Sequence, residues 1–239
     1  MLKVLDLFSG IGGFSLGLER TGGFETVAFC EIDKKARAVL AKHWPDVPIF
    51  DDVCTLTQEA LNERAISVDV VCGGFPCQDL SLAGRGAGLD GQQSGLWFEY
   101  HRIIAETRPS WVIIENVPAL RSRGLDRVLW SLAEIGYDAE WHCIPASAVG
   151  APHRRDRIWI VANAMRESLE RQWKISIGTG EAHQDTSDSR WWAAEPDVGR
   201  MAYGVPGRVD RIKQLGNSVV PQIPEMIGRA ILAVEQVRP

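Results

Sequence analysis

A short apolar run followed by a glycine-rich turn constrains this chain more than any other feature. The run Val68-Asp69-Val70-Val71-Cys72 is rich in β-branched residues, and Gly73-Gly74-Phe75-Pro76-Cys77 follows it directly. A run of this kind is typical of a strand buried on both faces of a parallel sheet. Open α/β sheets bind their ligands beyond the carboxyl ends of such strands. Cys77 is therefore a candidate nucleophile, although most free cysteines are simply buried apolar residues.

The rest of the chain alternates strand-like and helix-like segments. Short apolar segments, expected as strands, span 3–8, 26–30, 110–114, 137–145 and 158–162. Helical segments are expected from Phe14 and over 34–43, 56–62, 95–106 and the stretch containing Ile223, Ile227 and Ile231. This alternation predicts a doubly wound, mostly parallel α/β sheet. The length of 239 residues fits one large domain, or one domain with a small insertion.

Composition excludes several classes of protein. The chain is 45% hydrophobic, yet no apolar run approaches the roughly 20 residues needed to cross a bilayer. Its amino terminus does not read as a secretory signal, because Asp6 and Gly10 interrupt the apolar segment. The five cysteines form no metal-binding spacing, so we expect reduced thiols, a cytoplasmic location and no metal. The net charge is −5, but residues 154–239 hold 13 Lys/Arg against 11 Asp/Glu and are compatible with DNA.

The turn after the first strand is a candidate cofactor site. Gly10, Gly12 and Gly13 bring bare backbone and the first N–H groups of a helix toward a ligand. Ser15 breaks the dinucleotide fingerprint G-x-G-x-x-G. Glu31 ends the next strand, where an acid typically binds ribose hydroxyls, although it could instead be merely solvated.

The acids around this turn favour a cationic cofactor. Asp6, Glu31 and Asp33 would repel a pyrophosphate. S-adenosylmethionine instead carries an ammonium and a sulfonium, so we expect this cofactor rather than a nicotinamide dinucleotide.

Five motifs together identify a family. They are Asp-Leu-Phe-Ser-Gly-Ile-Gly-Gly-Phe from Asp6, Gly-Phe-Pro-Cys-Gln from Gly74, Glu-Asn-Val from Glu115, Arg-Asp-Arg from Arg155, and Gln-Leu-Gly-Asn-Ser-Val-Val-Pro from Gln214. In this order they resemble the cytosine-C5 DNA methyltransferases, over about 1–163 and 212–236. The resemblance implies the S-adenosylmethionine-dependent methyltransferase fold and a DNA (cytosine-5-)-methyltransferase.

The resemblance also assigns roles to residues. It implies Cys77 as the covalent nucleophile on cytosine C6, Glu115 as the acid, Arg157 as the carbonyl clamp and Arg155 as its assistant. A thiolate adding at C6 makes C5 nucleophilic, and a desolvated glutamate can protonate N3. The implied cofactor contacts are Phe8 on adenine, Glu31 on ribose and Asp52 on the adenine amino group, with Ser9, Gly10, Gly12, Gly13, Ile32, Val53, Pro76, Asn217 and Ser218.

The segment 164–208 differs in character from its surroundings. It is polar and weakly periodic, and it lies where the family places target recognition, which is usually much longer. We expect 1–163 with 209–239 to form the catalytic domain and 164–208 to form a small irregular recognition region. Trp191 and Trp192 could contact DNA or anchor a small core. The glycine-rich loop 83–88 around Arg85 is expected as a lid over the DNA, or else as a linker.

The expected partner is double-stranded DNA, with the target base flipped out of the stack. We also expect a monomer and, in a restriction-modification system, a cognate restriction enzyme. Three alternatives stay open from the sequence: an RNA cytosine-C5 methyltransferase, a nicotinamide oxidoreductase and a non-catalytic relative.

Overall fold

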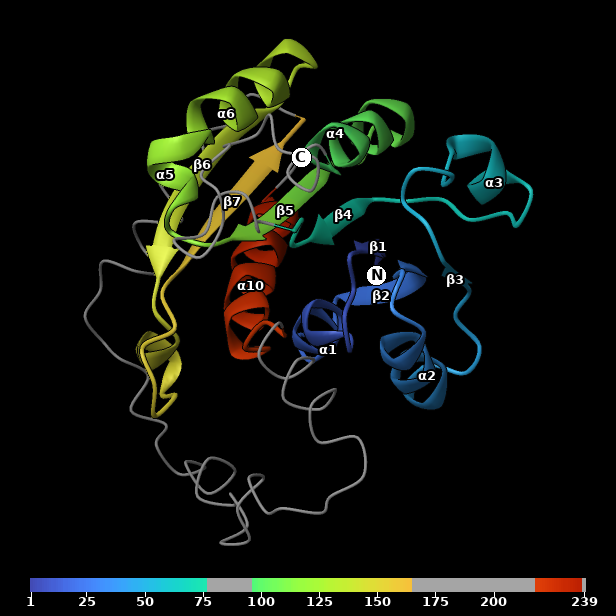
Figure 1. Cartoon of the computed structure of the whole chain (residues 1–239), viewed down its shortest axis with the longest axis horizontal. Helices are drawn as coiled ribbons and strands as arrows, with labels where there is room; N and C mark the ends of the chain where they lie inside the picture. Colours follow the sequence, from blue (N-terminus) through green and yellow to red (C-terminus); the bar gives the residue numbers. More distant parts are fainter. Residues whose placement is uncertain (77–95, 165–217, 238–239) are drawn as a thin grey trace, which may run out of the picture.

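The computed structural model describes residues 1–76, 96–164 and 218–237 (Figure 1). Within these residues one seven-stranded sheet has the order β3-β2-β1-β4-β5-β7-β6. Strands β1 to β5 run parallel, and β7 runs antiparallel to both of its neighbours, β5 and β6. The strands span Leu2–Leu7 (β1), Phe24–Cys30 (β2), Ile49–Phe50 (β3), Val70–Gly73 (β4), Trp111–Asn116 (β5), Asp138–Ile144 (β6) and Arg157–Asn163 (β7).

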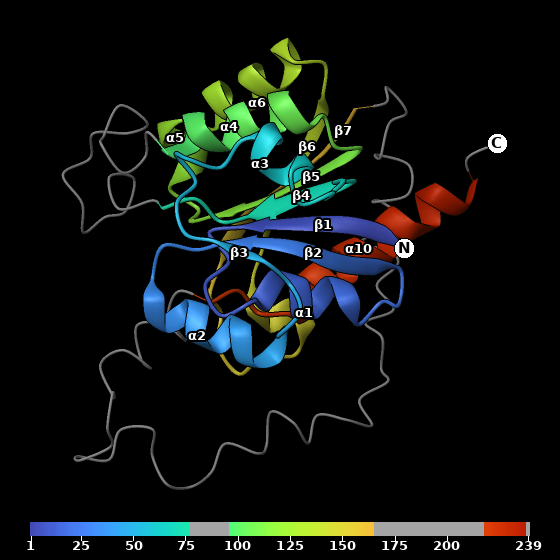
Figure 2. The same cartoon turned by 90° about the vertical axis from the view of Figure 1, so that its right-hand side faces the viewer.

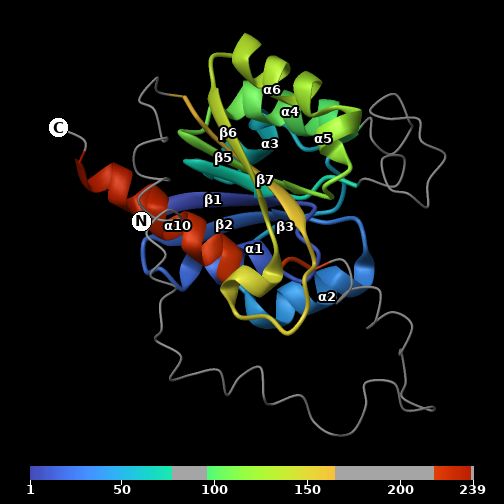
Figure 3. The ribbon, with the colours of Figure 1, turned by 90° about the vertical axis from the view of Figure 1, so that its left-hand side faces the viewer.

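Helices cover both faces of the sheet (Figures 2 and 3). One face carries α1 (Gly13–Glu19), α2 (Lys34–His43) and α10 (Gln222–Val237). The other carries α3 (Gln58–Asn62), α4 (Leu96–Thr107), α5 (Leu120–Arg123) and α6 (Leu125–Glu134). A 3₁₀ turn, η2 (Ala146–Val149), joins β6 to β7. The predicted doubly wound α/β fold with a mostly parallel sheet is confirmed.

The central strand β4 shows why its sequence is apolar throughout. Val71 packs in the hydrophobic core on the α4 and α6 side, whereas Val70 and Cys72 pack on the α1 and α10 side. All three side chains are inaccessible to solvent. A strand with helices on both faces has no solvent-facing side, so alternation of polar and apolar residues is lost. Its end at Gly73 leads directly to the turn before Cys77.

Helix α2 has the bounds that its flanking residues predict. Asp33 caps its first turn, because Oδ1 accepts hydrogen bonds from the backbone N–H of Lys35 at 2.8 Å and of Ala36 at 3.3 Å. At the other end, Pro45 cannot continue the helix, which finishes before Trp44. The helix therefore starts shortly after Glu31, and its other end packs against the glycine turn, where a Cβ on Gly12 would meet Leu40 and Trp44.

Helix α10 returns the end of the chain to the sheet. Its buried residues Ile223, Ile227 and Ile231 recur at helical spacing and pack in the same core as Leu18 of α1. Burying each isoleucine contributes roughly 1.5–3 kcal/mol relative to exposure. The predicted packing of this helix beside the first one is confirmed. It holds the end of the last motif against α1, where an added Cβ on Gly13 would meet Val219 and one on Gly17 would meet Pro221.

The antiparallel strand β7 determines where Arg157 meets Glu115. Asn116 at the end of β5 pairs with Ile158 at the start of β7. The residue before this pair, Arg157, consequently begins β7 at the edge of the sheet where the parallel strands end. Antiparallel pairing thus brings Glu115 and Arg157 together, although they are 42 positions apart in the sequence.

Candidate active site

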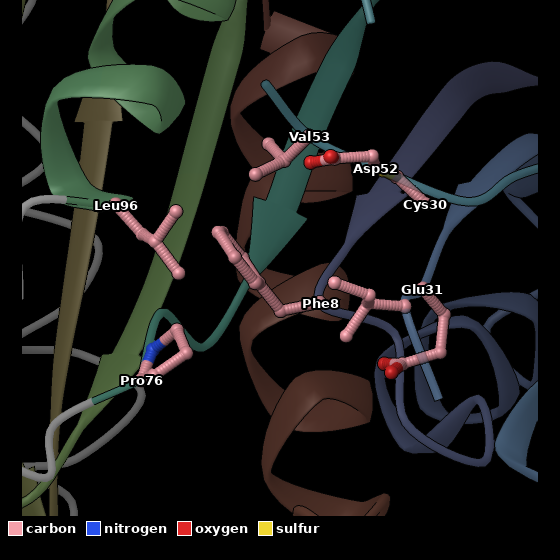
Figure 4. A pocket seen from close by; sticks show the side chains of 8 residues that line it. Phe8, Cys30, Glu31, Asp52, Val53, Pro76 and Leu96 are labelled. Carbon is pink, nitrogen blue, oxygen red and sulfur yellow. The ribbon is translucent and has the colours of Figure 1, made fainter. Parts of the chain in front are cut away.

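A pocket opens at the carboxyl ends of β1, β2 and β4 (Figure 4). Its wall is mostly apolar, and two carboxylates supply its charge. The lining residues are Phe8, Cys30, Glu31, Ile32, Asp52, Val53, Pro76 and Leu96. Six of them are predicted cofactor residues, so this pocket is where the sequence places the cofactor. Cys30 and Leu96 were not among the predicted residues.

Glu31 joins two of the chain turns that border the pocket. Its Oε2 accepts a hydrogen bond from the backbone N–H of Gly10 at 2.7 Å, and its Oε1 accepts one from that of Asp33 at 2.8 Å. Bonds from two backbone amides fix the orientation of the carboxylate before any ligand arrives. A carboxylate oxygen can accept more than one hydrogen bond, so both oxygens can still bind ligand hydroxyls.

Phe8 is held in a conformation that few residues adopt. Its φ is +51°, in the left-handed region, and Gly10 follows with φ +54°. Non-glycine residues with positive φ cluster at ligand sites. The Phe8 ring stacks on Tyr100 of α4, with ring centroids 6.1 Å apart and an interplanar angle of 12°. Figure 4 shows this ring between Leu96 and Pro76 on one side and Glu31 on the other, as a face for a planar group.

A set of ion pairs on α4 supports the turn that carries Asp52. Arg102 donates to the carbonyl oxygens of Val53 and Leu56, each at 3.0 Å. Its other nitrogens pair at 2.8 Å with Glu99 and Glu106, one turn away on either side. Sequence reasoning missed this support. The i, i+3 and i+4 spacing of the three charges was visible, but the two carbonyls are about 50 positions away.

Two of the three acids that suggested a cationic cofactor do not face the pocket. Asp6 is fully buried, and its Oδ2 accepts hydrogen bonds from the Ser15 hydroxyl at 2.8 Å and the Ser15 N–H at 3.3 Å. Burial raises the Asp6 pKa to about 8, so this side chain is largely neutral at pH 7. Asp33 is used as the cap of α2. The negative charge at the pocket therefore comes from Glu31 and Asp52, which corrects the argument from three acids.

Glu115 and Arg157 form a partly buried ion pair beside this pocket. The Arg157 Nε donates to Glu115 Oε1 at 2.8 Å, and the side chains are only 22% and 12% exposed. Burial raises the pKa of Glu115, whereas the positive charges of Arg157 and Arg155 act to lower it. Burial prevails, so this glutamate takes up a proton more readily than an exposed one. Glu115 is thus suited to work as an acid.

Arg155 connects the loop before β7 to the last of the five motifs, which contains Ser218. Its backbone has φ +36°, and its side chain donates to the carbonyl oxygen of Ser218 at 2.7 Å. Burial and the neighbouring charge of Arg157 lower its pKa. Ser218 lies in turn against Gly13, where an added Cβ would be 3.1 Å from the serine Oγ. Gly13, Ser218 and Arg155 therefore bring three segments into contact: the glycine turn after β1, the last motif and the loop before β7.

The nucleophile loop is described as far as Pro76. A Cβ on Gly74 would stand 2.7 Å from Glu115 Oε2, so only glycine lets the loop pass the acid this closely. Asn116 donates from Nδ2 to the carbonyl of Phe75 at 3.3 Å, and the buried Phe75 ring packs against Trp97 of α4. The residue before Cys77 is thus fixed between the acid and the cofactor pocket.

The comparisons with known proteins decide the family. A family model described as C-5 cytosine-specific DNA methylase matches residues 2–197. The chain belongs to this family. The chain is 39% identical over 174 residues to the Type II methyltransferase M2.BsuMI of Bacillus subtilis strain 168, covering 70% of this chain and 43% of that protein. It is 37% identical over 162 residues to the Type II methyltransferase M.CviJI of Paramecium bursaria Chlorella virus IL3A, covering 67% and 42%.

Solved structures agree on the fold of the chain. A putative DNA modification methyltransferase encoded within an Escherichia coli prophage is 28% identical, with a TM-score of 0.58, covering 68% of this chain and 47% of that one. Entamoeba histolytica EhMeth, at 17% identity and a TM-score of 0.60, supports the fold alone. The chain spans less than half the length of the two curated relatives named above, from Bacillus subtilis and the Chlorella virus. Family membership argues against the nicotinamide oxidoreductase alternative.

Several of the predicted site residues and segments of the chain lie outside the described residues. They are Cys77, the lid loop 83–88, Asn217 and almost all of the recognition segment 164–208. Across 1–76, 96–164 and 218–237, no helix is long and apolar enough to span a membrane. Over the same residues, no three His, Cys, Asp or Glu side chains gather as a metal site would require.

Proposed function

We propose that this chain transfers a methyl group from S-adenosylmethionine to C5 of a cytosine in DNA, through a covalent bond between Cys77 and C6. The observation that carries the proposal is the partly buried Glu115–Arg157 pair, set beside the loop that leads to Cys77 and near the pocket lined by Phe8, Glu31 and Asp52. Acid, fixed cation and thiol are the three groups that this reaction needs. Family membership supports the same reaction.

The pocket fits S-adenosylmethionine in its chemistry. Phe8, Val53 and Leu96 offer apolar surface for the adenine ring. Glu31 offers oxygens for the ribose hydroxyls, and Asp52 an acceptor for the adenine amino group. The two carboxylates suit a ligand with a positive charge and disfavour a pyrophosphate. The cofactor, when bound, supplies an electrophilic methyl group on its sulfonium.

The protein's own groups would make C5 reactive. The Cys77 thiolate forms a bond to C6, and the electron pair of the C5–C6 bond shifts into the ring, so that C5 becomes nucleophilic. Glu115 donates its proton to N3, which neutralises the charge that develops there. Arg157 places a fixed positive charge near the ring carbonyl. When C5 takes the methyl group, the N3–C4 double bond re-forms and N3 returns its proton to Glu115. A base then removes the C5 proton, the C5–C6 double bond re-forms and the thiolate leaves. The target base must first be flipped out of the duplex.

Incubation of the purified chain with duplex DNA and S-adenosylmethionine, followed by sequencing of 5-methylcytosine, tests the proposal. We expect methylation at a short recurring DNA sequence, and none with Cys77→Ser. Parallel incubation with transfer RNA separates the RNA alternative, since methylation there and not in DNA would replace the proposed substrate. An absence of product in both would favour a non-catalytic relative.

We further propose that 164–208 reads the target sequence, whereas 1–163 and 209–239 carry the chemistry. The described part of the chain supports this division, because its helices α1 to α6, helix α10 and its sheet account for the cofactor pocket and the acid. Each base-edge contact from a reader typically supplies about 1–3 kcal/mol of discrimination. A short reader therefore predicts a short target.

Glu31→Ala should weaken binding of S-adenosylmethionine by about 1–3 kcal/mol, because a carboxylate that accepts ligand hydroxyls is lost. Calorimetry measures this directly. S-adenosylhomocysteine lacks the sulfonium charge. If Glu31 binds the ribose, the variant's binding free energy for this ligand should fall by the same amount. The matched control is Glu25→Ala, an exposed glutamate on the same strand. Unchanged affinity for both ligands would place the ribose elsewhere.

A further inference from the structure

A second pocket lies on the surface beside the Glu115–Arg157 pair. Three elements build it: the segment after β5, the end of β6 and the loop before β7. Its lining residues are Pro118, Arg121, Ser122, Cys143, Pro145, Arg154 and Asp156. Only Asp156 belongs to one of the five motifs, and it has no role in the proposed chemistry.

The pocket offers more positive charge than negative. Arg121 is exposed, and its guanidinium has no ion-pair partner among the residues that the structure describes. Arg154 is 85% exposed and lies 3.5 Å from the Asp156 carboxylate, which is itself 42% exposed. An exposed pair of this kind is weak, so Arg154 can exchange its partner at little cost. The exposed Ser122 adds a hydroxyl at the rim.

The position of the pocket is fixed relative to the acid. Pro118 comes two residues after Asn116, the last residue of β5. On the opposite wall, the carbonyl of Asp156 accepts a hydrogen bond from Arg157 at 2.8 Å. The pocket is therefore next to the groups that would hold a flipped cytosine. The sugar-phosphate backbone of that nucleotide has to leave the site across a neighbouring surface, and this surface carries two arginines.

We propose that this pocket binds a backbone phosphate of the DNA strand that carries the target cytosine. Guanidinium groups match phosphate oxygens in geometry and can bind them with two parallel hydrogen bonds. Arg121 supplies the main contact, and Arg154 turns from Asp156 to the phosphate. The Ser122 hydroxyl, which donates to the Ala119 carbonyl at 3.3 Å, turns to donate to the phosphate instead. Such a contact fixes the position of the strand and carries no sequence information. The proposal rests on the proposed function, because it takes DNA as the substrate.

Salt dependence of DNA binding tests the contact. In fluorescence anisotropy with a labelled duplex, Arg121→Gln should bind more weakly at low salt than the wild type. Its plot of log affinity against log salt should be shallower by about 0.9, the value for one lost phosphate contact. Arg20→Gln, at an exposed arginine after α1 on the opposite edge of the sheet, should leave the slope unchanged. An unchanged slope in Arg121→Gln would overturn the proposal.

Cys143 provides a second readout that does not depend on a substitution in the pocket. Its thiol is exposed, as is that of Cys54 near the cofactor pocket. Duplex DNA should slow alkylation of Cys143 by iodoacetamide, measured by mass spectrometry, and leave the rate at Cys54 unchanged. Equal rates with and without DNA would contradict the assignment. Protection by inorganic phosphate at equal ionic strength, with none from DNA, would identify a free-anion site instead and equally contradict it.

The two proposals can fail separately. Suppose that the wild type methylates DNA, but Arg121→Gln does not change the salt slope and DNA does not slow alkylation of Cys143. The phosphate pocket is then wrong and the proposed function stands. If the wild type binds and protects as expected but methylates no DNA, the proposed function fails and the pocket stands. A wild-type chain that binds no duplex at all overturns the pocket.

Discussion

Replacing Cys77 with serine should abolish DNA methylation and leave the affinity for S-adenosylmethionine unchanged. A serine hydroxyl stays protonated near pH 7, whereas a thiol placed in a favourable site ionises and adds to C6. Methyl transfer into duplex DNA measures the loss, and calorimetry measures cofactor binding. A duplex with 5-fluorocytosine at the target should trap a covalent adduct with the wild type, because fluorine at C5 cannot leave as a proton does. The serine variant should form none.

The matched control for this experiment is Cys54→Ser, a change of the same atoms at an exposed thiol. It should methylate DNA at the wild-type rate. Product from Cys77→Ser at a rate near that of the wild type would mean that no covalent bond to this residue is needed. The mechanism proposed above would then be wrong, although the family assignment would remain.

Glu115→Gln should lower the rate of methyl transfer by about 10²- to 10⁴-fold, the usual contribution of a positioned acid. Glutamine keeps the shape of glutamate and an oxygen that can accept a hydrogen bond from Arg157. A lower rate would therefore reflect the loss of the carboxyl proton. Burial raises the pKa of Glu115, so its neutral form persists to higher pH than in an exposed glutamate. As pH rises through that raised pKa the proton is lost and the single-turnover rate should fall. The glutamine variant should lack this fall.

Two controls separate chemistry from folding. Glu63→Gln changes an exposed glutamate after α3 and should leave the rate unaltered. Thermal unfolding should show that Glu115→Gln remains folded at the assay temperature but melts at a lower temperature than the wild type, since Arg157 loses its counter-charge and keeps only a neutral acceptor. A rate within a few-fold of the wild type, with the same dependence on pH, would assign the proton on N3 to another group.

The sequence predicted best those features that depend on neighbouring residues. The start of α2 follows from the capping Asp33 and its end from Pro45, and the structure has both bounds as predicted. Glu31 and Pro76 come just after buried strands, so the parallel sheet brings them to one edge and into one pocket. The family motifs gave Glu115 and Arg157 roles in the same reaction, which no local pattern indicates, but their ion pair was not predicted.

Features that depend on which distant segments meet could not be predicted. An aspartate at the end of an apolar strand reads the same whether it faces a ligand or the core, and Asp6 faces the core because Ser15 is there to bond it. Arg102 reads as one charge on an amphipathic helix, yet it holds the backbone of the Asp52 turn. Leu96 joins the pocket only because α4 begins beside it.

The two ends of the sheet give this fold a consequence for its evolution. Strand β7 finishes with Asn163 paired to Trp111, at the edge opposite the active site, whereas the chain returns at Ser218 beside Gly13. Neither attachment depends on how many residues join them, and doubling the length of a connecting loop costs only about 0.6 kcal/mol. If 164–208 reads the target as proposed, recombination can therefore exchange this segment for another of different length and target. The spacing of Glu115 and Arg157 is set by strand register and is inherited unchanged.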